Sequence, residues 1–188
     1  DSLNYLLNRK DINSQIYFTG SSYRDNNYGM TWVNTILNKQ FKNKWCVVVD
    51  VDELIMLKQG DDLNTIKSKM KKDNSNVLPC IMIDFYPKNT KSKEYIKGDD
   101  FLSYSCFYDK MNEDTVFYEY QLDNQLTIKG GFRHRHVYGS VKPTNDSVCL
   151  TKRSFFKNDF YDSHHLSEGI HWLHPNEFEN WMDSGNRK

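Results

Sequence analysis

The sequence has no excess of charge of either sign. Its 188 residues include 25 Lys and Arg and 25 Asp and Glu, so the formal net charge is zero. Because proteins that bind nucleic acid or anionic membranes usually carry a basic excess, this balance argues against both kinds of partner. The chain also lacks an apolar run of the roughly 18 residues that a membrane helix needs, and no basic-then-apolar leader opens it. We therefore expect a cytoplasmic protein without a transmembrane segment.

The cysteines do not have the spacing of a metal or redox motif. The chain contains four, and none belongs to a Cys-x-x-Cys pair: Cys46, Cys80, Cys106 and Cys149. The sequence therefore encodes neither a zinc ribbon nor a dithiol redox motif. Free thiols in a reducing cytosol are the simplest interpretation.

Aromatic residues, in contrast, are abundant. Phe, Trp and Tyr make up 14% of the chain, and each buries a large apolar area when it packs in a core. The length suits one compact domain, and no repeat, low-complexity tract or linker divides the chain. We therefore predict a single domain that spans residues 1–188.

The first half of the chain alternates helical and strand patterns. We predict helices over residues 2–9, 31–40 and 63–72 and strands over 15–19, 45–49 and 77–86. The segment 45–49, Trp-Cys-Val-Val-Val, is apolar at every position. This is typical of a strand covered on both faces in a mostly parallel sheet. Strand, helix and strand in this order predict an α/β layer fold.

The second half has a different pattern, in which aromatic stretches are separated by polar loops and helical periodicity is faint. Short strands are predicted over residues 101–108, 116–120, 132–138 and 148–156. We therefore expect an irregular antiparallel β arrangement after residue 88.

Three acidic residues follow the apolar strand 45–49 directly. They are Asp50, Asp52 and Glu53. If the backbone stays extended here, Asp50 and Asp52 point to the same side and Val51 points into the fold. Carboxylates held this close repel one another unless a cation neutralises them. Mg²⁺ or Mn²⁺ suits such oxygen ligands and would also bind a diphosphate. The alternative is a simple acidic turn or helix cap.

The string WCVVVDVDEL at residues 45–54 resembles the metal-binding segment of GT-A fold glycosyltransferases, specifically bacterial family 2-like enzymes. A second specific string is GGFRHR at residues 130–135. Softer matches in the same order are Ser22-Tyr23, residues 29–34, residues 83–87, Tyr108-Asp109, Lys152 and Ser163-His164. The resemblance covers nearly the whole chain.

This resemblance implies a GT-A fold with a mixed, Rossmann-like sheet and an irregular antiparallel C-terminal half. It also implies a metal-dependent enzyme that moves a sugar from a nucleotide-diphosphate donor, most simply a UDP-sugar, to a hydroxyl of a glycan or other acceptor. Asp50 and Asp52 would hold Mn²⁺ or Mg²⁺, which stabilises the leaving diphosphate. Glu53 would contribute to substrate binding. A late histidine commonly adds a metal ligand in these enzymes, and His164 fits best, with His171 and His174 as substitutes.

The string GGFRHR suggests a site for anionic substrate groups. On a strand, Arg133 and Arg135 would share one face and could clamp a phosphate or an acidic acceptor, while Gly130 and Gly131 would allow close backbone approach. Arginines that pair with nearby acids are an equally good interpretation. Lys152 is a weaker substrate-binding candidate, and a surface cation is the simpler interpretation of it.

Family 2 enzymes usually invert the anomeric centre, which requires a general base for the acceptor hydroxyl. Asp84, at the end of the strand 77–86, and Asp109 are the candidates. Neither belongs to the Glu-Asp pair that often supplies this base in family 2. An alternative for Asp84 is a structural role in the turn toward Pro87.

Two other functions are open from the sequence. A haloacid-dehalogenase-like phosphohydrolase would use Asp50 as its nucleophile, although Leu54 stands where such enzymes usually carry Thr or Val. A non-catalytic carbohydrate-binding module would use the aromatic residues of the second half to stack on sugars.

The match to GT-A enzymes starts after the family's first strand and helix. We therefore expect the chain to be an excerpt that lacks part of the nucleotide pocket and is inactive alone. A sheet edge left open by the missing strand would be prone to pair with another chain.

Overall fold

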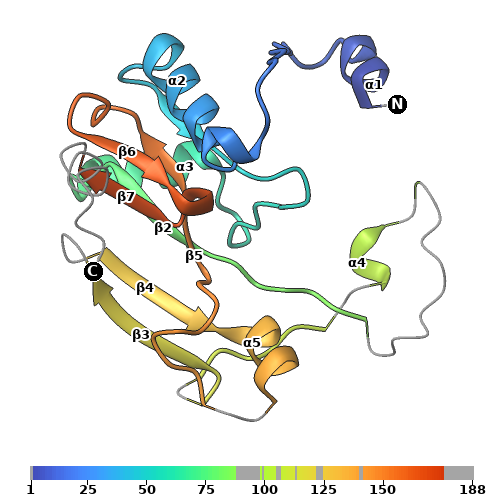
Figure 1. Cartoon of the computed structure of the whole chain (residues 1–188), viewed down its shortest axis with the longest axis vertical. Helices are drawn as coiled ribbons and strands as arrows, with labels where there is room; N and C mark the ends of the chain where they lie inside the picture. Colours follow the sequence, from blue (N-terminus) through green and yellow to red (C-terminus); the bar gives the residue numbers. More distant parts are fainter. Residues whose placement is uncertain are drawn as a thin grey trace.

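The computed structural model describes residues 2–87, 98, 100–104, 107–112, 114–121, 125–139 and 142–175. These residues form a mixed α/β structure in which every strand pairing is antiparallel (Figure 1). A three-stranded sheet and two separate two-stranded sheets carry the fold. None of the helices within these residues is long and apolar enough to cross a membrane.

The three-stranded sheet has the order β1 (Trp45–Val47), β5 (Thr151–Lys157) and β2 (Val77–Ile81). Strand β5 lies in the middle and runs antiparallel to both neighbours, so β1 and β2 run in the same direction. Residues 151–156 of β5 are all buried, as expected for a central strand. This three-stranded sheet is therefore antiparallel throughout.

This sheet corrects the prediction for residues 45–49. The segment does form a strand at β1, but Val47 and Val49 are 38% and 40% exposed. Within the described residues β1 has a single neighbour, the antiparallel β5, so it does not lie inside a mostly parallel sheet. The described residues thus do not show the Rossmann-like sheet of the GT-A fold. A run of apolar residues reports a tendency to be buried, not the number of neighbouring strands.

Two amphipathic helices have the predicted bounds within a residue. They are α2 (Met30–Gln40) and α3 (Leu63–Lys72). The side chain of Asp62 caps α3 by accepting a hydrogen bond from the backbone N–H of Thr65. The amide side chain of Asn34 on α2 donates to and accepts from the backbone of Leu166, with distances of 2.7 and 3.0 Å. Helix α2 is thereby fixed to strand β6 (His164–Ser167).

The main hydrophobic core lies between α2, the central sheet and the segment that contains β6. Its buried members are Met30, Leu37, Phe156, Leu166 and Ile170. Phe156, near the end of β5, is completely buried. Strand β6 pairs with β7 (Trp172–Pro175), and the short 3-10 helix η3 (Glu168–Ile170) lies between them in the sequence.

The other two-stranded sheet consists of β3 (Val116–Gln121) and β4 (Gln125–Gly130). Helix α5 (Gly131–Tyr138) follows β4 directly, so the predicted strand over 132–138 is wrong. The backbones of Gly130 and Gly131 have φ angles of 125° and 72°, which interrupt the strand. A Cβ atom at Gly130 would lie 2.5 Å from the carbonyl oxygen of Thr115 and 3.0 Å from Pro143, so only glycine fits there.

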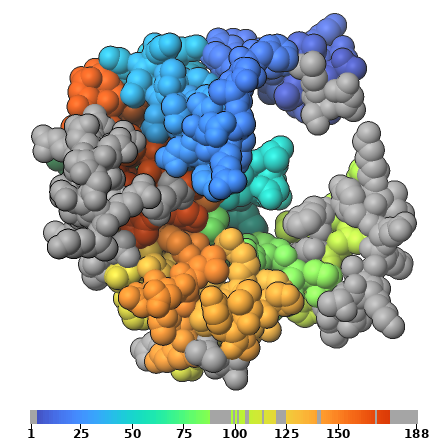
Figure 2. Space-filling view, in the orientation of Figure 1, coloured from blue at the N-terminus to red at the C-terminus, as the bar shows by residue number. Residues whose placement is uncertain are grey.

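The remaining predicted elements have mixed outcomes. The helix over 2–9 is confirmed as α1 (Ser2–Asn8), and the strand over 148–156 corresponds to β5. Residues 15–19 form no strand, and Phe18 among them is 85% exposed. The predicted strand over 101–108 instead begins with a short helix, α4 (Phe101–Tyr104). The dark blue N-terminal segment with α1 projects from the body of the molecule (Figure 2).

Three of the cysteines, Cys46, Cys80 and Cys149, are free thiols. Cys106 lies outside the described residues. A single 3-10 turn, η1 (Arg24–Asn26), precedes α2.

Candidate functional site

The strand order brings several sequence-predicted residues to one end of the three-stranded sheet. Strands β1 and β2 finish at this end, and the antiparallel β5 begins there. Backbone pairing continues beyond the strands, from Val48 N–H to the Ser154 carbonyl at 2.8 Å and from Met82 N–H to the Leu150 carbonyl at 2.7 Å. The acidic segment after β1, Lys152 on β5 and Asp84 after β2 therefore lie around the same end of the sheet.

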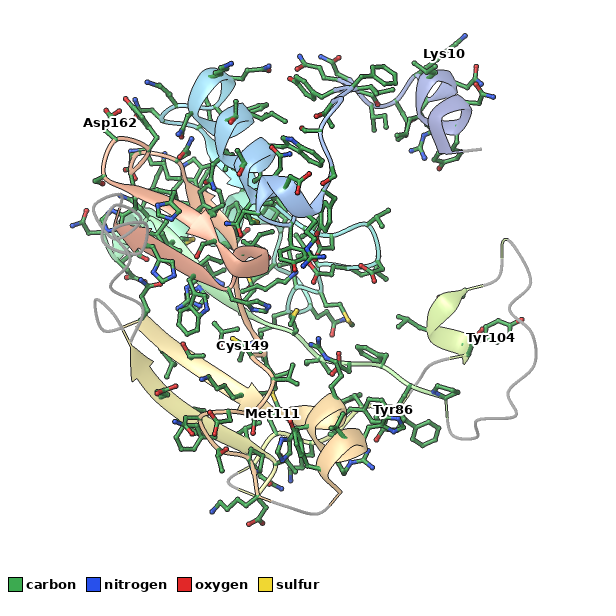
Figure 3. All side chains as sticks on the ribbon, in the orientation of Figure 1. Lys10, Tyr86, Tyr104, Met111, Cys149 and Asp162 are labelled. Atoms are coloured by element: carbon green, nitrogen blue, oxygen red, sulfur yellow. The ribbon has the colours of Figure 1, made fainter. Side chains whose placement is uncertain are left out.

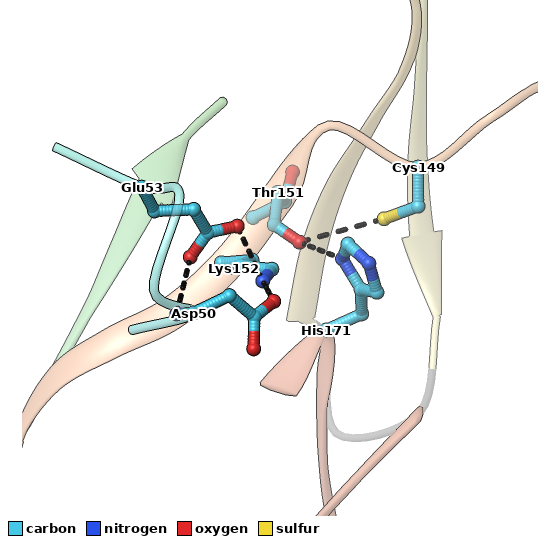
Figure 4. A network of polar contacts seen from close by, with 6 residues as sticks. All are labelled: Asp50, Glu53, Cys149, Thr151, Lys152 and His171. Atoms are coloured by element: carbon cyan, nitrogen blue, oxygen red, sulfur yellow. Dashed lines mark hydrogen bonds and ion pairs between the residues drawn. The ribbon is translucent and has the colours of Figure 1, made fainter. Parts of the chain in front are cut away.

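Lys152 is the centre of the site (Figure 4). Its Nζ lies 2.7 Å from Oδ2 of Asp50 and 2.5 Å from Oε1 of Glu53. The Lys152 side chain is only 5% exposed, whereas those of Asp50 and Glu53 are 60% and 25% exposed. Burial lowers the pKa of Lys152, but the bonds to the two carboxylates outweigh it and the net shift is upward. The ammonium is therefore charged, and the interpretation of Lys152 as a surface cation is wrong.

The acidic segment itself is a turn. The N–H of Glu53 donates to the Asp50 carbonyl at 3.1 Å, and the N–H of Asp50 donates to Oε2 of Glu53 at 3.1 Å. The backbone is thus not extended, and Val51 is fully exposed instead of pointing into the fold. Asp52 is also exposed. In the structure, Lys152 joins Asp50 to Glu53. The sequence had predicted that Asp50 and Asp52 would share one side instead.

The oxygen ligands partly fit the implied metal. Oδ2 of Asp50 binds Lys152, yet the side chain is mostly exposed, so its other oxygen and the carboxylate of Asp52 face solvent. These are the hard ligands that Mg²⁺ and Mn²⁺ take, usually with water and phosphate oxygens completing the shell. His164 is on β6, where its Nδ1 lies 2.9 Å from the Ser163 hydroxyl. Among the described residues, no three His, Cys, Asp or Glu side chains gather into a metal-binding group, so His164 does not join the two aspartates.

The two arginines of the GGFRHR string are on a helix, which corrects their predicted arrangement on one strand face. Positions two residues apart on a helix do not face the same side. Nε of Arg133 lies 3.0 Å from Oδ2 of Asp84. Arg135 donates to both carboxylate oxygens of Asp109, at 2.9 and 2.8 Å. Each arginine thus pairs with one of the two predicted bases, as the alternative interpretation expected.

The Asp109 pair includes an aromatic neighbour. The hydroxyl of Tyr86 donates to Oδ1 of Asp109 at 2.6 Å, and the Tyr86 ring stacks on Phe132 with centroids 4.4 Å apart. Tyr86 lies beside α5 (Figure 3). The bonds from Arg135 hold the pKa of the Asp109 carboxyl below its usual value, with a smaller contribution from Tyr86. A carboxylate stabilised in this way is a weaker proton acceptor.

His171 borders the same site, although the sequence offered it only as a substitute for His164. Its Nδ1 lies 2.6 Å from the carbonyl oxygen of Thr151, the residue before Lys152 (Figure 4). Burial is the main cause of its lowered pKa, and the hydrogen bond to Thr151 opposes this effect. The charges of Lys152 and Arg133 lower the pKa further, while Glu53 raises it. No spacing or motif in the sequence singles out His171, because its place is set by the η3 turn and by strand β5.

Arg153 is a buried residue that sequence reasoning missed. It is 3% exposed and donates to the carbonyl oxygens of His171 and Leu126, at 2.8 and 3.1 Å. Its guanidinium also lies over the ring of Trp172. On β5, Lys152 and Arg153 point to opposite faces of the sheet. Arg153 therefore supports the backbone that carries His171.

Comparisons with known proteins found no match: no protein-family model, no curated protein and no solved structure is similar to this chain.

Proposed function

We propose that the protein is a metal-dependent glycosyltransferase with a GT-A fold of the family 2-like type. It would move a sugar from a nucleotide-diphosphate donor, with a UDP-sugar as the first choice, to an acceptor hydroxyl with inversion, and it would act in the cytoplasm. The observation that carries the proposal is the acidic turn at the sheet edge, where a buried Lys152 binds Asp50 and Glu53.

This cluster is costly to maintain. Taking a lysine out of water carries a desolvation penalty, and replacing buried ion pairs by apolar residues often stabilises a protein. A buried charge cluster at the end of a sheet is therefore a candidate for function. Both β1 and β2 end at this edge, with Asp50 and Asp84 just beyond them.

Each residue of the site has a distinct role in this proposal. Lys152 fixes the turn through Asp50 and Glu53, so the outward oxygen of Asp50 and the carboxylate of Asp52 remain available. These two carboxylates would hold Mn²⁺ or Mg²⁺. When bound there, the metal would stabilise the negative charge that develops on the leaving diphosphate. The φ angles at Gly130 and Gly131 place the start of α5, and with it Arg133, beside Asp84.

The test is calorimetry of the full-length protein with UDP-glucose, UDP-galactose, UDP-N-acetylglucosamine and the matching GDP-sugars, with and without Mn²⁺. Asp52→Asn removes one proposed ligand charge, and Asp73→Asn, at the exposed end of α3, is the matched control. We expect one donor to bind with Mn²⁺, at least tenfold more weakly in Asp52→Asn and unchanged in Asp73→Asn.

Other outcomes would overturn the proposal. Undiminished, metal-independent binding by Asp52→Asn would remove the metal site. A phosphorylated Asp50 trapped during turnover of a phosphate ester would identify a phosphohydrolase. Sugar affinity that neither UDP nor chelation changes would identify a carbohydrate-binding module.

A further inference from the structure

An inverting transfer needs a group that accepts the proton of the acceptor hydroxyl. Both aspartates expected in this role are paired with arginines, Asp84 with Arg133 and Asp109 with Arg135. For Asp109 the pairing also lowers the pKa of the carboxyl. The geometry of the site therefore favours another base.

The hydrogen bond of His171 settles which of its ring nitrogens is basic. A carbonyl oxygen can only accept, so Nδ1 of His171 carries the hydrogen in its 2.6 Å bond to Thr151. In the neutral ring, Nε2 then has the free lone pair. The same bond fixes the orientation of the ring, and it would stabilise the Nδ1–H of an imidazolium.

Gly169 lies beside the Nε2 edge of the His171 ring, which is half-buried. Gly169 has a φ angle of 65°, and a Cβ placed there would lie 3.8 Å from Nε2 and 3.6 Å from Cδ2. Because residue 169 is glycine, it places no side chain against this nitrogen. The charged groups that act on the ring are Lys152 from β5, Arg133 from α5 and Glu53 from the acidic turn.

We propose that His171 is the general base of the transfer and accepts the proton of the acceptor hydroxyl at Nε2. This inference rests on the proposed function. The acceptor oxygen forms a bond to the anomeric carbon while the bond from that carbon to the diphosphate oxygen breaks, and its electron pair leaves with the nucleoside diphosphate. The proton moves to Nε2, and the imidazolium that results returns it to water. Partial burial lowers the pKa of His171, which favours the neutral ring that this role requires.

The first test uses the full-length protein with Mn²⁺ and the UDP- or GDP-sugar that binds best in calorimetry. Release of the nucleoside diphosphate is measured against pH, with octyl glucoside or water as the acceptor. For the unaltered protein, kcat/KM should fall on the acid side with a midpoint below pH 6.5, the ordinary pKa of histidine. In His171→Gln, kcat should drop about 10²- to 10⁴-fold and this acid limb should disappear.

Donor affinity separates the two proposals. We expect His171→Gln to bind the donor and Mn²⁺ within about twofold of the unaltered protein, since the role lies in proton transfer. His136→Gln, at an exposed position on α5, is the matched control and should keep the rate and pH profile. Metal-dependent donor binding combined with an unchanged acid limb in His171→Gln would overturn the assignment of the base and leave the transferase standing. Absence of any nucleotide-sugar binding would overturn both.

A second measurement keeps the proposal testable if His171→Gln does not fold. Nitrogen-15 NMR of the histidines in the unaltered protein at pH 7.5 should show a neutral ring with hydrogen on Nδ1 for His171. Hydrogen on Nε2, or a charged ring at this pH, would overturn the proposal without any assay of activity.

Discussion

Lys152→Met tests whether the buried ammonium holds the acidic turn. Methionine replaces the unbranched apolar part of the side chain, but it leaves Asp50 and Glu53 without their shared cation. Removing one partner of a buried ion pair costs roughly 3–5 kcal/mol. Asp50 is 60% exposed and can be solvated instead, so we expect a loss of about 2–3 kcal/mol in the free energy of unfolding. For a chain of this length that corresponds to a fall in Tm of roughly 5–10 °C.

The assay is urea unfolding followed by tryptophan fluorescence at pH 7.5. Lys157→Met is the matched control, because Lys157 lies on the same strand and pairs with Asp159 at 3.2 Å, but its side chain is 35% exposed. A pair that is partly open to solvent, as this one is, contributes about 1 kcal/mol or less. The double variant Lys152→Met with Glu53→Gln should lose less than the two single variants together. The reasoning is refuted if Lys152→Met costs no more than Lys157→Met, or if the two changes are additive.

Three further variants test other parts of the structure. Gly130→Ala should lose more than about 3 kcal/mol in urea unfolding, because its φ is positive and its Cβ would meet the Thr115 carbonyl oxygen. Gly139 also has a positive φ but has open space around it, so Gly139→Ala should lose about 1 kcal/mol. Equal losses in the two variants would contradict this. Asp109→Asn should cost about 1 kcal/mol at pH 7, since Arg135 is half exposed. Because the pKa of Asp109 is lowered in the folded state, this carboxylate stabilises the fold above its unfolded pKa, and the stabilisation is lost as the pH falls through the folded pKa. The free energy of unfolding of Asp109→Asn should therefore depend less on pH below about 4 than that of the unaltered protein. An unchanged acid profile would contradict the ion pair. Phe156→Ala should lose about 3–5 kcal/mol by thermal unfolding, and a loss under 1 kcal/mol would place this side chain outside the core.

The sequence predicted helix bounds correctly where the spacing of apolar residues alone determines them. Apolar periodicity placed α2 and α3 within a residue of their observed bounds, because a helix needs only one face to bury. The same kind of reasoning failed at 132–138, where alternating residues suggested a strand and the structure has α5. There the positive φ angles of Gly130 and Gly131 decide where the strand stops, and the flexibility of two glycines alone does not indicate that a helix comes next.

Only part of the candidate site could be predicted from the sequence, because its residues come together through long-range strand order. Asp50 and Glu53 stand out in the sequence because they follow an apolar strand. Lys152 binds them from about a hundred residues away, which depends on β5 lying between β1 and β2. His171 is brought in by the same strand. Such contacts follow from the order of strands in a sheet, and no local spacing encodes that order.

Strand β5 links the assembly of the sheet to the chemistry of its edge. Adjacent residues on it point to opposite faces of the sheet, with Lys152 toward the carboxylates and Arg153 toward the carbonyls of His171 and Leu126. A slip of a single position would turn both side chains to the opposite faces and would put either Arg153 or Thr151 where Lys152 now binds the acids. An inserted or deleted residue in this strand should thus erase the acidic turn and misplace the histidine together, even where overall compactness survives.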